Sequence, residues 1–271
     1  ERIPTTDPRE TLDRVIGFFR ARAAEGLSVR SLGIGCFGPV DLDPASAGWG
    51  FITSTPKLRW QGTDVAGTLG RALGVPVGFD TDVNAAALAE YRLGAAKGRD
   101  PAVYLTVGTG IGGGAVVNGR LLHGASHPEM GHMLMSRRGD DGFPGSCPFH
   151  GSCWEGLASG PAVEARWGRR GEDLPPDHPA WDLEAWYLAQ GIVSLQMVLS
   201  PRAVILGGGI GQVPGLIDRV RSAAASLCAG YLDHPRSPVE WADVIRTPGL
   251  KIPGLDGAFL LAQDAVKPKE P

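Results

Sequence analysis

Cysteine is scarce in this sequence, and so are long apolar segments and any strong excess of charge. The chain has four cysteines in 271 residues, and its formal net charge of −3 suggests no attraction to nucleic acid or anionic lipid. No apolar run approaches the roughly 20 residues that span a bilayer, and no signal peptide is visible. We therefore expect a cytoplasmic protein that binds neither nucleic acid nor membrane.

Low-complexity tracts and internal repeats are also missing, although glycine and proline are abundant. The 40 glycines and 22 prolines fall at turns between ordered segments, and the length of the chain allows two domains. Apolar strands alternate with amphipathic helices, for example in 63–74, 75–80 and 81–98. This alternation predicts an α/β architecture in which helices cover mixed sheets.

The segment CPFHGSC brings two cysteines and a histidine together. Cys147, His150 and Cys153 are spaced three residues apart, and His132 of the upstream HPEMGH segment could complete a Cys2His2 set. Zinc suits such a shell, and four protein ligands leave no open position for hydrolysis. We therefore predict a structural zinc that holds a polar, glycine-rich loop. A Cys147–Cys153 disulfide, rare in cytosolic proteins, and two free thiols beside surface histidines are the alternatives.

Two glycine-rich turns could hold phosphate groups. TVGTGIGGG, residues 106–114, lies between two apolar strands, where glycine N–H groups and the hydroxyl of Thr109 can donate to a phosphate. LGGGIG, residues 206–211, follows a buried strand and precedes a helix, where a nucleotide can bind. A bulged hairpin and a tight strand-to-helix turn are the respective structural alternatives. Together, the two turns favour a nucleotide more than either does alone.

Four acidic side chains are candidates for chemistry. Asp80 and Asp82 lie at the junction of a predicted strand and helix, where the helix dipole would keep Asp82 ionised. That carboxylate could accept a proton from an alcohol that attacks a phosphoryl group, whereas helix capping by Asp82 or Thr81 is the structural alternative. Glu129 and Glu155 flank the predicted zinc ligands, so they could bind sugar hydroxyls with fixed geometry; solvated loop charge is their alternative.

Five motifs together resemble one protein family. DTDVNAAALAE, TVGTGIGGG, HPEMGH, CPFHGSCWEGLASGPA and ILGGGIG occur in the order found in the ROK family of repressors, open reading frames and sugar kinases. HPEMGH with CPFHGSC closely resembles the bacterial ROK fructokinases. The resemblance implies an actin-like (ribonuclease H-like) fold of two α/β domains, with sugar and ATP in an interdomain cleft. It implies a smaller domain at 1–92, on which a C-terminal helix at 256–271 packs, and a larger domain at 93–255 with the zinc loop.

The resemblance also implies a role for each matching residue. Asp82 would be the catalytic base and would contact the sugar. Structural zinc would be bound by His132, Cys147, His150 and Cys153, and Mg²⁺ would accompany ATP. The other sugar-binding positions would be Gly38, Pro39, Glu129, His132 and Glu155. The nucleotide-binding positions would be Gly108, Thr109, Gly110, Gly112, Pro161, Gly207, Gly208, Gly209, Ile210 and Gly211.

Two departures from the family pattern bear on function. Thr81 precedes the predicted base where many members have asparagine, and the fructokinase branch accepts threonine, so this favours fructose over glucose. Family members also open with a strand and a DxGGT-like loop that holds ATP phosphates and helps to place magnesium. Neither lies within these 271 residues, which do not begin with Met, so we expect the N-terminal strand or strands to precede them.

We therefore predict an ATP-dependent fructokinase that phosphorylates the 6-hydroxyl of fructose. A kinase for glucose or mannose is the first alternative, because specificity depends on a few hydroxyl contacts. A non-catalytic ROK-type sugar-binding regulator is the second, although no helix-turn-helix or basic stretch is visible. The apolar segment at 183–199 could contribute to a homodimer, and burial within one chain is its alternative.

Overall fold

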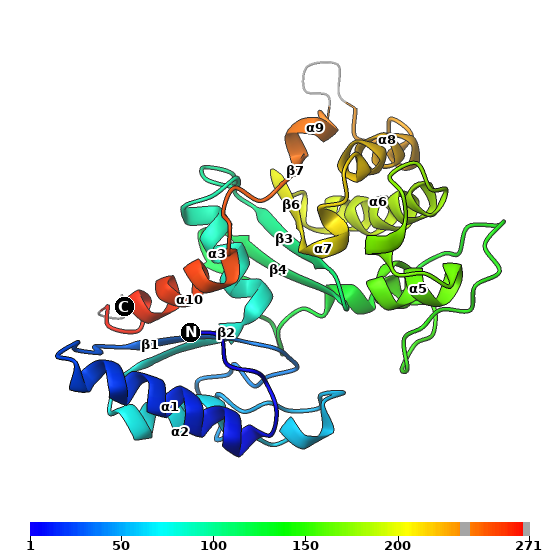
Figure 1. Ribbon diagram of the computed structural model, residues 1–271. Coiled ribbons are helices and arrows are strands. Elements are labelled where there is room, and N and C mark those ends of the chain that lie inside the picture. Colours follow the sequence, from blue (N-terminus) through cyan, green and yellow to red (C-terminus); the bar gives the residue numbers. More distant parts are fainter. Residues whose placement is uncertain (234–238, 268–271) are drawn as a thin grey trace. The chain divides into compact units, whose positions relative to one another are not determined.

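The computed structural model describes residues 1–233 and 239–267, and the chain divides into two compact units (Figure 1). Each unit has its own sheet and its own apolar core. Residues 268–271 of the predicted C-terminal helix lie outside the described residues. The expected domains, a smaller one at 1–92 and a larger one at 93–255, stay a prediction. Unit 1 comprises Glu1–Ala89, His123–His127 and Ile252–Pro271, and unit 2 comprises Glu90–Leu122 and Pro128–Lys251.

Unit 1 is built on two parallel strands, β1 (Leu32–Cys36) and β2 (Val77–Thr81), which pair along their whole length. Helices α1 (Pro8–Ala24) and α2 (Val65–Leu73) pack together on one side of this pair (Figure 1). Helix α10 (Pro253–Asp264) packs directly on both strands from the other side. A segment from the end of the chain therefore completes the unit formed by its beginning.

Two glycines in the strands allow α10 to approach the sheet closely. A Cβ atom added at Gly33 of β1 would clash with the backbone of Ala258, and one at Gly78 of β2 would clash with the backbone of Leu261. Any side chain at these two positions would have to displace the helix from the sheet.

Local sequence explains where the first helices of unit 1 begin and end. Asp7 accepts the N–H of Arg9 at 3.0 Å, and a proline follows it, so α1 has a capped start. Asp64 accepts the N–H of Gly67 at 2.8 Å at the start of α2. Gly74 ends that helix in the left-handed conformation, with φ of 67°.

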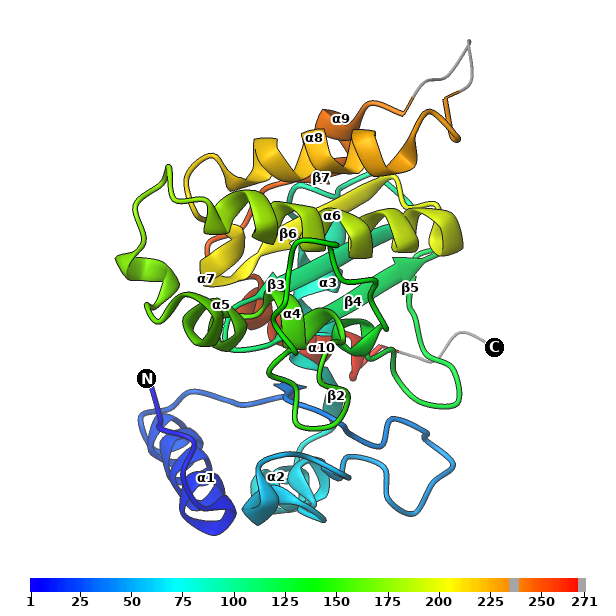
Figure 2. The same cartoon turned by 90° about the vertical axis from the view of Figure 1, so that its right-hand side faces the viewer.

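Unit 2 contains a five-stranded sheet. In spatial order its strands are β5 (Arg120–Leu121), β4 (Ile111–Val117), β3 (Ala102–Val107), β6 (Ala203–Gly207) and β7 (Ile245–Arg246). Strands β3 and β4 form an antiparallel hairpin, whereas β3, β6 and β7 run parallel. Helices α6 (Ala180–Leu199) and α8 (Leu216–Cys228) lie side by side over one face of this sheet (Figure 2).

Most apolar side chains of α6 are buried in the core of unit 2. Trp181, Tyr187 and Leu188 are fully buried in it. Met197 and Val198, near the end of the helix, are exposed. Burial within one chain therefore explains the apolar segment at 183–199, and a homodimer stays a prediction.

Among the described residues no helix combines the length and the apolar character that crossing a membrane requires. Helix α3 runs from unit 1 into unit 2. The remaining elements are η1 (Leu58–Trp60), α3 (Asp82–Arg92), η2 (Met130–His132), α4 (Trp154–Ala158), α5 (Gly160–Trp167), η3 (Gly171–Asp173), α7 (Gly208–Gly211) and α9 (Trp241–Val244).

Glu90, near the end of α3, is a fully buried carboxylate with a structural role. It accepts the N–H of Ala95 at 2.7 Å and the N–H groups of Gly249 and Leu250 at 3.0 Å each. A buried carboxylate is tolerated when its lone pairs are satisfied in this way. Glu90 thereby joins the end of α3 to the segment that precedes α10.

Replacing Glu90 by alanine should lower the free energy of unfolding by about 3 kcal/mol, because three N–H groups lose their acceptor. Guanidinium chloride denaturation would measure the change. The matched control is Glu164→Ala, at an exposed position of α5, which should change stability by less than about 0.5 kcal/mol. Equal stability of the two variants would contradict the role given to Glu90.

Candidate functional site

Asp82 is the first residue of α3 and directly follows β2. Thr81 caps this helix, because its Oγ1 accepts the N–H of Asn84 at 3.1 Å. The Asp82 carboxylate accepts the N–H of Val83 at 2.9 Å, and the side chain is exposed. Helix capping was the structural alternative to a catalytic role for Asp82. Because Thr81 caps the helix instead, the exposed Asp82 carboxylate is available to a substrate.

The surroundings of Asp82 raise the pKa of its carboxyl group above the ordinary value. Partial loss of hydration is the largest cause, although the side chain keeps contact with solvent. Nearby backbone N–H groups, the positive charge of Lys57 and, last, the His127 imidazole oppose it. The sequence predicts that the helix dipole keeps this carboxylate ionised, so the direction of the shift differs from that expectation. A raised pKa makes the carboxylate a stronger proton acceptor, which suits a general base.

Asp80, at the end of β2, has a structural task and is buried. Its Oδ1 accepts the N–H of Thr81 at 2.8 Å and the side-chain amide of Asn84 at 2.7 Å. Its Oδ2 lies 2.9 Å from Nε2 of His123, and this hydrogen bond raises the pKa of the imidazole. Asp80 thus fixes the start of α3 and ties the segment that contains His123 to unit 1.

The predicted sugar-binding turn, Gly38–Pro39, follows the end of β1, and its peptide bond is cis. The next residue, Val40, donates its N–H to Nε2 of buried His127 at 3.0 Å. Because β1 and β2 are parallel, this turn and Asp82 lie at the same edge of the pair, beyond the carboxyl ends of the strands. Ligands of open α/β sheets bind at this kind of edge.

The two glycine-rich turns begin side by side in unit 2, because they follow the adjacent parallel strands β3 and β6. A Cβ atom at Gly208, where φ is +81°, would clash with the backbone of Val107. The atom nearest to a Cβ at Gly108 would be the backbone nitrogen of Gly209, 4.0 Å away. Backbone N–H groups of both turns can therefore approach one ligand.

Two further predicted nucleotide positions lie at the first of these turns. Thr109 is exposed at its tip. Gly160 donates its N–H to the carbonyl oxygen of Gly108 at 2.7 Å, which places the adjacent Pro161, in the first turn of α5, beside the same turn. The structure therefore brings Gly108, Pro161 and the Gly207–Gly209 turn together in unit 2.

Three other predicted nucleotide positions belong to packed structure. Gly112 lies in β4, opposite Thr106 of β3. Ile210 is buried and its side chain is part of the apolar core, and Gly211 packs against Leu206. Any contact between a nucleotide and Ile210 would therefore involve its backbone.

Glu155, at the start of α4, contacts the first glycine turn. Its Oε2 accepts the N–H of Ile111 at 3.0 Å, and a Cβ atom at Gly110 would lie 2.5 Å from the same oxygen. A side chain at position 110 would therefore push against this carboxylate. Glu155 positions the turn through one oxygen, and Oε1 is the atom that could meet a sugar hydroxyl.

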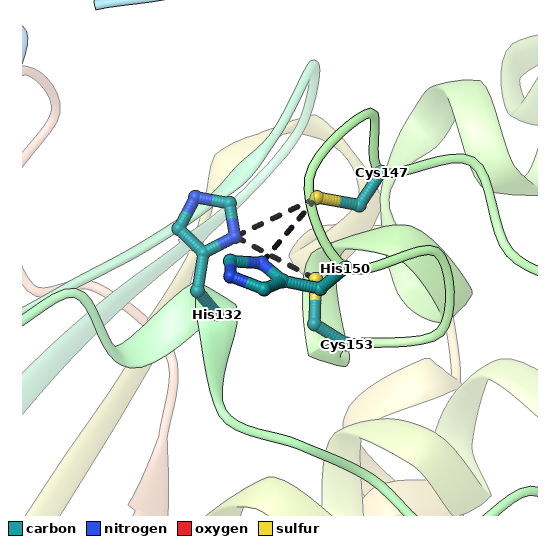
Figure 3. A group of neighbouring side chains, drawn as sticks. All are labelled: His132, Cys147, His150 and Cys153. Atoms are coloured by element: carbon teal, nitrogen blue, oxygen red, sulfur yellow. Dashed lines mark hydrogen bonds between the residues drawn. The ribbon is translucent and has the colours of Figure 1, made fainter. Parts of the chain in front are cut away.

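Four side chains of unit 2 converge as the sequence predicts for a metal (Figure 3). Nδ1 of His132 lies 3.5 Å from Sγ of Cys153 and 3.8 Å from Sγ of Cys147. Nδ1 of His150 lies 3.8 Å from Sγ of Cys147. The four ligand atoms all lie within 4.8 Å of one another, and the cluster is consistent with a structural zinc.

The chemistry and spacing of this cluster fit a tetrahedral cation. Zn–S bonds of about 2.3 Å and Zn–N bonds of about 2.0 Å, at tetrahedral angles, place the ligand atoms about 3.3–3.8 Å apart. Cys147 and Cys153 are buried and are free thiols, so the structure shows no disulfide between them. Glu129 immediately precedes η2, and its carbonyl oxygen accepts the N–H of His132 at 3.0 Å, so an exposed predicted sugar ligand is adjacent to the cluster.

A second set of contacts holds the metal-binding loop against α5 and α6. Oδ2 of Asp141 accepts the hydroxyl of Tyr187 at 2.6 Å and a guanidinium N–H of Arg166 at 3.2 Å. The Arg166 guanidinium also lies over the ring of Phe143, 4.4 Å from its centroid. This anchor keeps part of the loop in place independently of a metal.

Sequence reasoning missed several side chains that act on these sites. Lys57 affects Asp82 through its charge, and no motif marks it. His127 is the first residue of the HPEMGH segment, and this motif is the sequence signal that could have placed it near Asp82. Asp141 lies in an irregular loop, where no periodic pattern indicates burial.

A solved structure shares this architecture. A ROK hexokinase from Thermus thermophilus matches with a TM-score of 0.77 and 29% identity, over 98% of this chain and 90% of that chain. The protein therefore has the α/β fold of the ROK hexokinases.

Comparison of the sequence with known proteins narrows the family more than the likeness in structure does. A fructokinase from Zymomonas mobilis is 45% identical over 97% of this chain and 87% of its own length. A fructokinase from Lactococcus lactis subsp. cremoris is 42% identical over 95% of this chain and 86% of its own length. The model of the ROK family matches residues 1–265. The chain belongs to the ROK family.

Proposed function

We propose that this protein is an ATP-dependent fructokinase that transfers the γ-phosphoryl group of ATP to the 6-hydroxyl of fructose. The observation that carries the proposal is the 42–45% identity to two fructokinases over nearly the whole chain. An exposed carboxylate with a raised pKa, at Asp82, and two adjacent glycine turns in unit 2 support it.

In this proposal Asp82 is the general base. The 6-hydroxyl oxygen of fructose forms a bond to the γ-phosphorus in line, the bond from phosphorus to the β,γ-bridging oxygen breaks, and ADP leaves. The hydroxyl proton passes to the Asp82 carboxylate. Backbone N–H groups of the glycine turns stabilise the negative charge of the phosphates, and Mg²⁺ bound to ATP would add positive charge there.

In unit 1 the proposed sugar-binding residues are Gly38, Pro39 and Asp82. In unit 2 they are Glu129, His132 and Glu155. His132 directs Nδ1 to the two sulfurs, so Nε2 of the same ring can serve the sugar. The proposed nucleotide positions are Gly108, Thr109, Gly110, Gly112, Pro161 and Gly207–Gly211, all in unit 2.

The proposed metal is zinc, bound by His132, Cys147, His150 and Cys153. A bound zinc would supply positive charge that fixes the loop and the orientation of the His132 ring. A homodimer, to which the exposed Met197 and Val198 could contribute, and a cytoplasmic location stay predictions.

A coupled assay of ADP release across fructose, glucose and mannose tests the substrate. We expect kcat/KM for fructose to exceed that for either aldose by about 100-fold, because a site that hydrogen-bonds one pattern of hydroxyl groups leaves polar groups unpaired with another. A higher kcat/KM for glucose or mannose would make the protein an aldohexose kinase. Sugar binding without phosphorylation of any hexose would favour a regulator.

A further inference from the structure

The ammonium group of Lys57 is held in a defined place in unit 1. Its Nζ lies over the ring of Phe37, 3.7 Å from the centroid. Phe37 in turn contacts the ring of Trp60 edge-on, with centroids 5.5 Å apart, and Trp60 is buried with its indole N–H donated to the carbonyl oxygen of Thr6 at 2.9 Å. A half-buried phenylalanine, held in turn by a buried and hydrogen-bonded tryptophan, therefore supports this surface lysine.

Strand register places Phe37, the ring that Lys57 contacts, at the same edge of the sheet as the proposed base. Cys36, the last residue of β1, pairs with Thr81, the last residue of β2. The residues that follow, Phe37 and Asp82, therefore leave neighbouring strands at the same edge. The positive charge of Lys57 also acts on both Asp82 and Cys36, lowering the pKa of each.

No carboxylate of the described residues occupies the N–H donors of the Lys57 ammonium group. In residues 1–233 and 239–267, Lys57 Nζ makes no ion pair within 4.0 Å, and the side chain is exposed. An ammonium group has three N–H donors and no acceptor, whereas sugar hydroxyl oxygens accept hydrogen bonds. The position of Lys57 therefore suits a neutral, hydroxyl-rich ligand that also reaches Asp82.

We propose that Lys57 is a sugar-binding residue whose ammonium donates hydrogen bonds to hydroxyl oxygens of the hexose that Asp82 deprotonates. The inference rests on the proposed kinase function and deepens it. Lys57 shares its edge of the sheet with Gly38, Pro39 and Asp82, which are proposed sugar positions, and this favours the sugar over a phosphate of ATP as its ligand.

Lys57→Met should raise KM for fructose by about 10–100-fold, while KM for ATP and kcat each change by less than about threefold. Fructose affinity measured by calorimetry without ATP should fall in parallel. Lys57→Gln, which keeps a donor without the charge, should show a smaller loss. Lys97→Met, at an exposed position of unit 2, is the matched control and should behave as the wild type.

The pH profile separates this role from a merely structural one. Among residues 1–233 and 239–267, Lys57, His127 and Cys36 are titratable groups that interact with Asp82, and loss of the Lys57 charge should raise the pKa of Asp82. The acidic limb of kcat/KM should therefore move to higher pH in Lys57→Met and not in Lys97→Met. An unchanged KM and affinity for fructose in a folded Lys57→Met variant would overturn the inference, as would a rise in KM for ATP alone. Absence of fructose phosphorylation by the wild type would instead count against the proposed function.

Discussion

Asp82→Asn should lower kcat with fructose by about 10³–10⁴-fold and leave the affinity for fructose nearly unchanged. In the wild type, Oδ1 of Asp82 accepts the N–H of Val83 at 2.9 Å. The asparagine amide has the size of the carboxylate and its oxygen can still accept this N–H. It cannot, however, take the proton of the 6-hydroxyl. Thr81 rather than Asp82 caps α3, so the helix should remain folded. The coupled assay gives kcat, and calorimetry without ATP gives the affinity for fructose.

Asp13→Asn is the matched control, because Asp13 is a strongly exposed aspartate of α1, and it should keep the kcat of the wild type. The pH dependence of the wild type is a further check. Because the pKa of Asp82 is raised, kcat/KM should fall as the pH drops through a value above the ordinary aspartate pKa of about 3.9. If Asp82→Asn retained more than about a tenth of the wild-type kcat, Asp82 would not be the base.

Local sequence signals explain why much of the fold could be predicted. Thr81 caps α3, Asp64 caps α2 and Gly74 ends it, and each acts within a few residues of its own position. The alternation of strands and helices likewise predicts an α/β fold, which the likeness to the ROK hexokinase confirms. The metal cluster could be predicted because three of its ligands lie within one short segment.

Features that depend on distant segments could not be predicted in this way. The contacts of Gly33 and Gly78 with α10 join the two ends of the sequence, and neither glycine lies in a recognisable motif. Glu90 is bound by N–H groups from a segment near the other end of the chain. The pKa of Asp82 depends on Lys57 and on local loss of hydration, and the helix-dipole argument contains neither. In each case tertiary packing, which single-sequence patterns do not contain, decides the outcome.

Cys153→Ala should abolish zinc binding and lower the free energy of unfolding by about 3–5 kcal/mol, because loss of a structural metal exceeds the usual effect of a point mutation. Cys153 is fully buried at the start of α4, and its Sγ lies 3.5 Å from Nδ1 of His132, so no other side chain can easily replace it. The contacts of Asp141 with Arg166 and Tyr187 should hold the rest of the loop, so the variant should fold but lose the fixed orientation of His132. Its kcat/KM for fructose should therefore fall by about 10–100-fold.

Metal analysis by mass spectrometry and thermal denaturation would measure these effects. The matched control is Cys228→Ala, a buried free thiol of α8 outside the cluster, which should keep about one zinc per chain. Burial raises the pKa of Cys153 to about 11, so zinc must displace a proton from this thiol, and the affinity for zinc should weaken as the pH falls. A chelator should accordingly remove the metal more readily at pH 5 than at pH 8, whatever the sugar. Wild-type protein that is pure, active and free of zinc would show that the four side chains hold the loop without a metal.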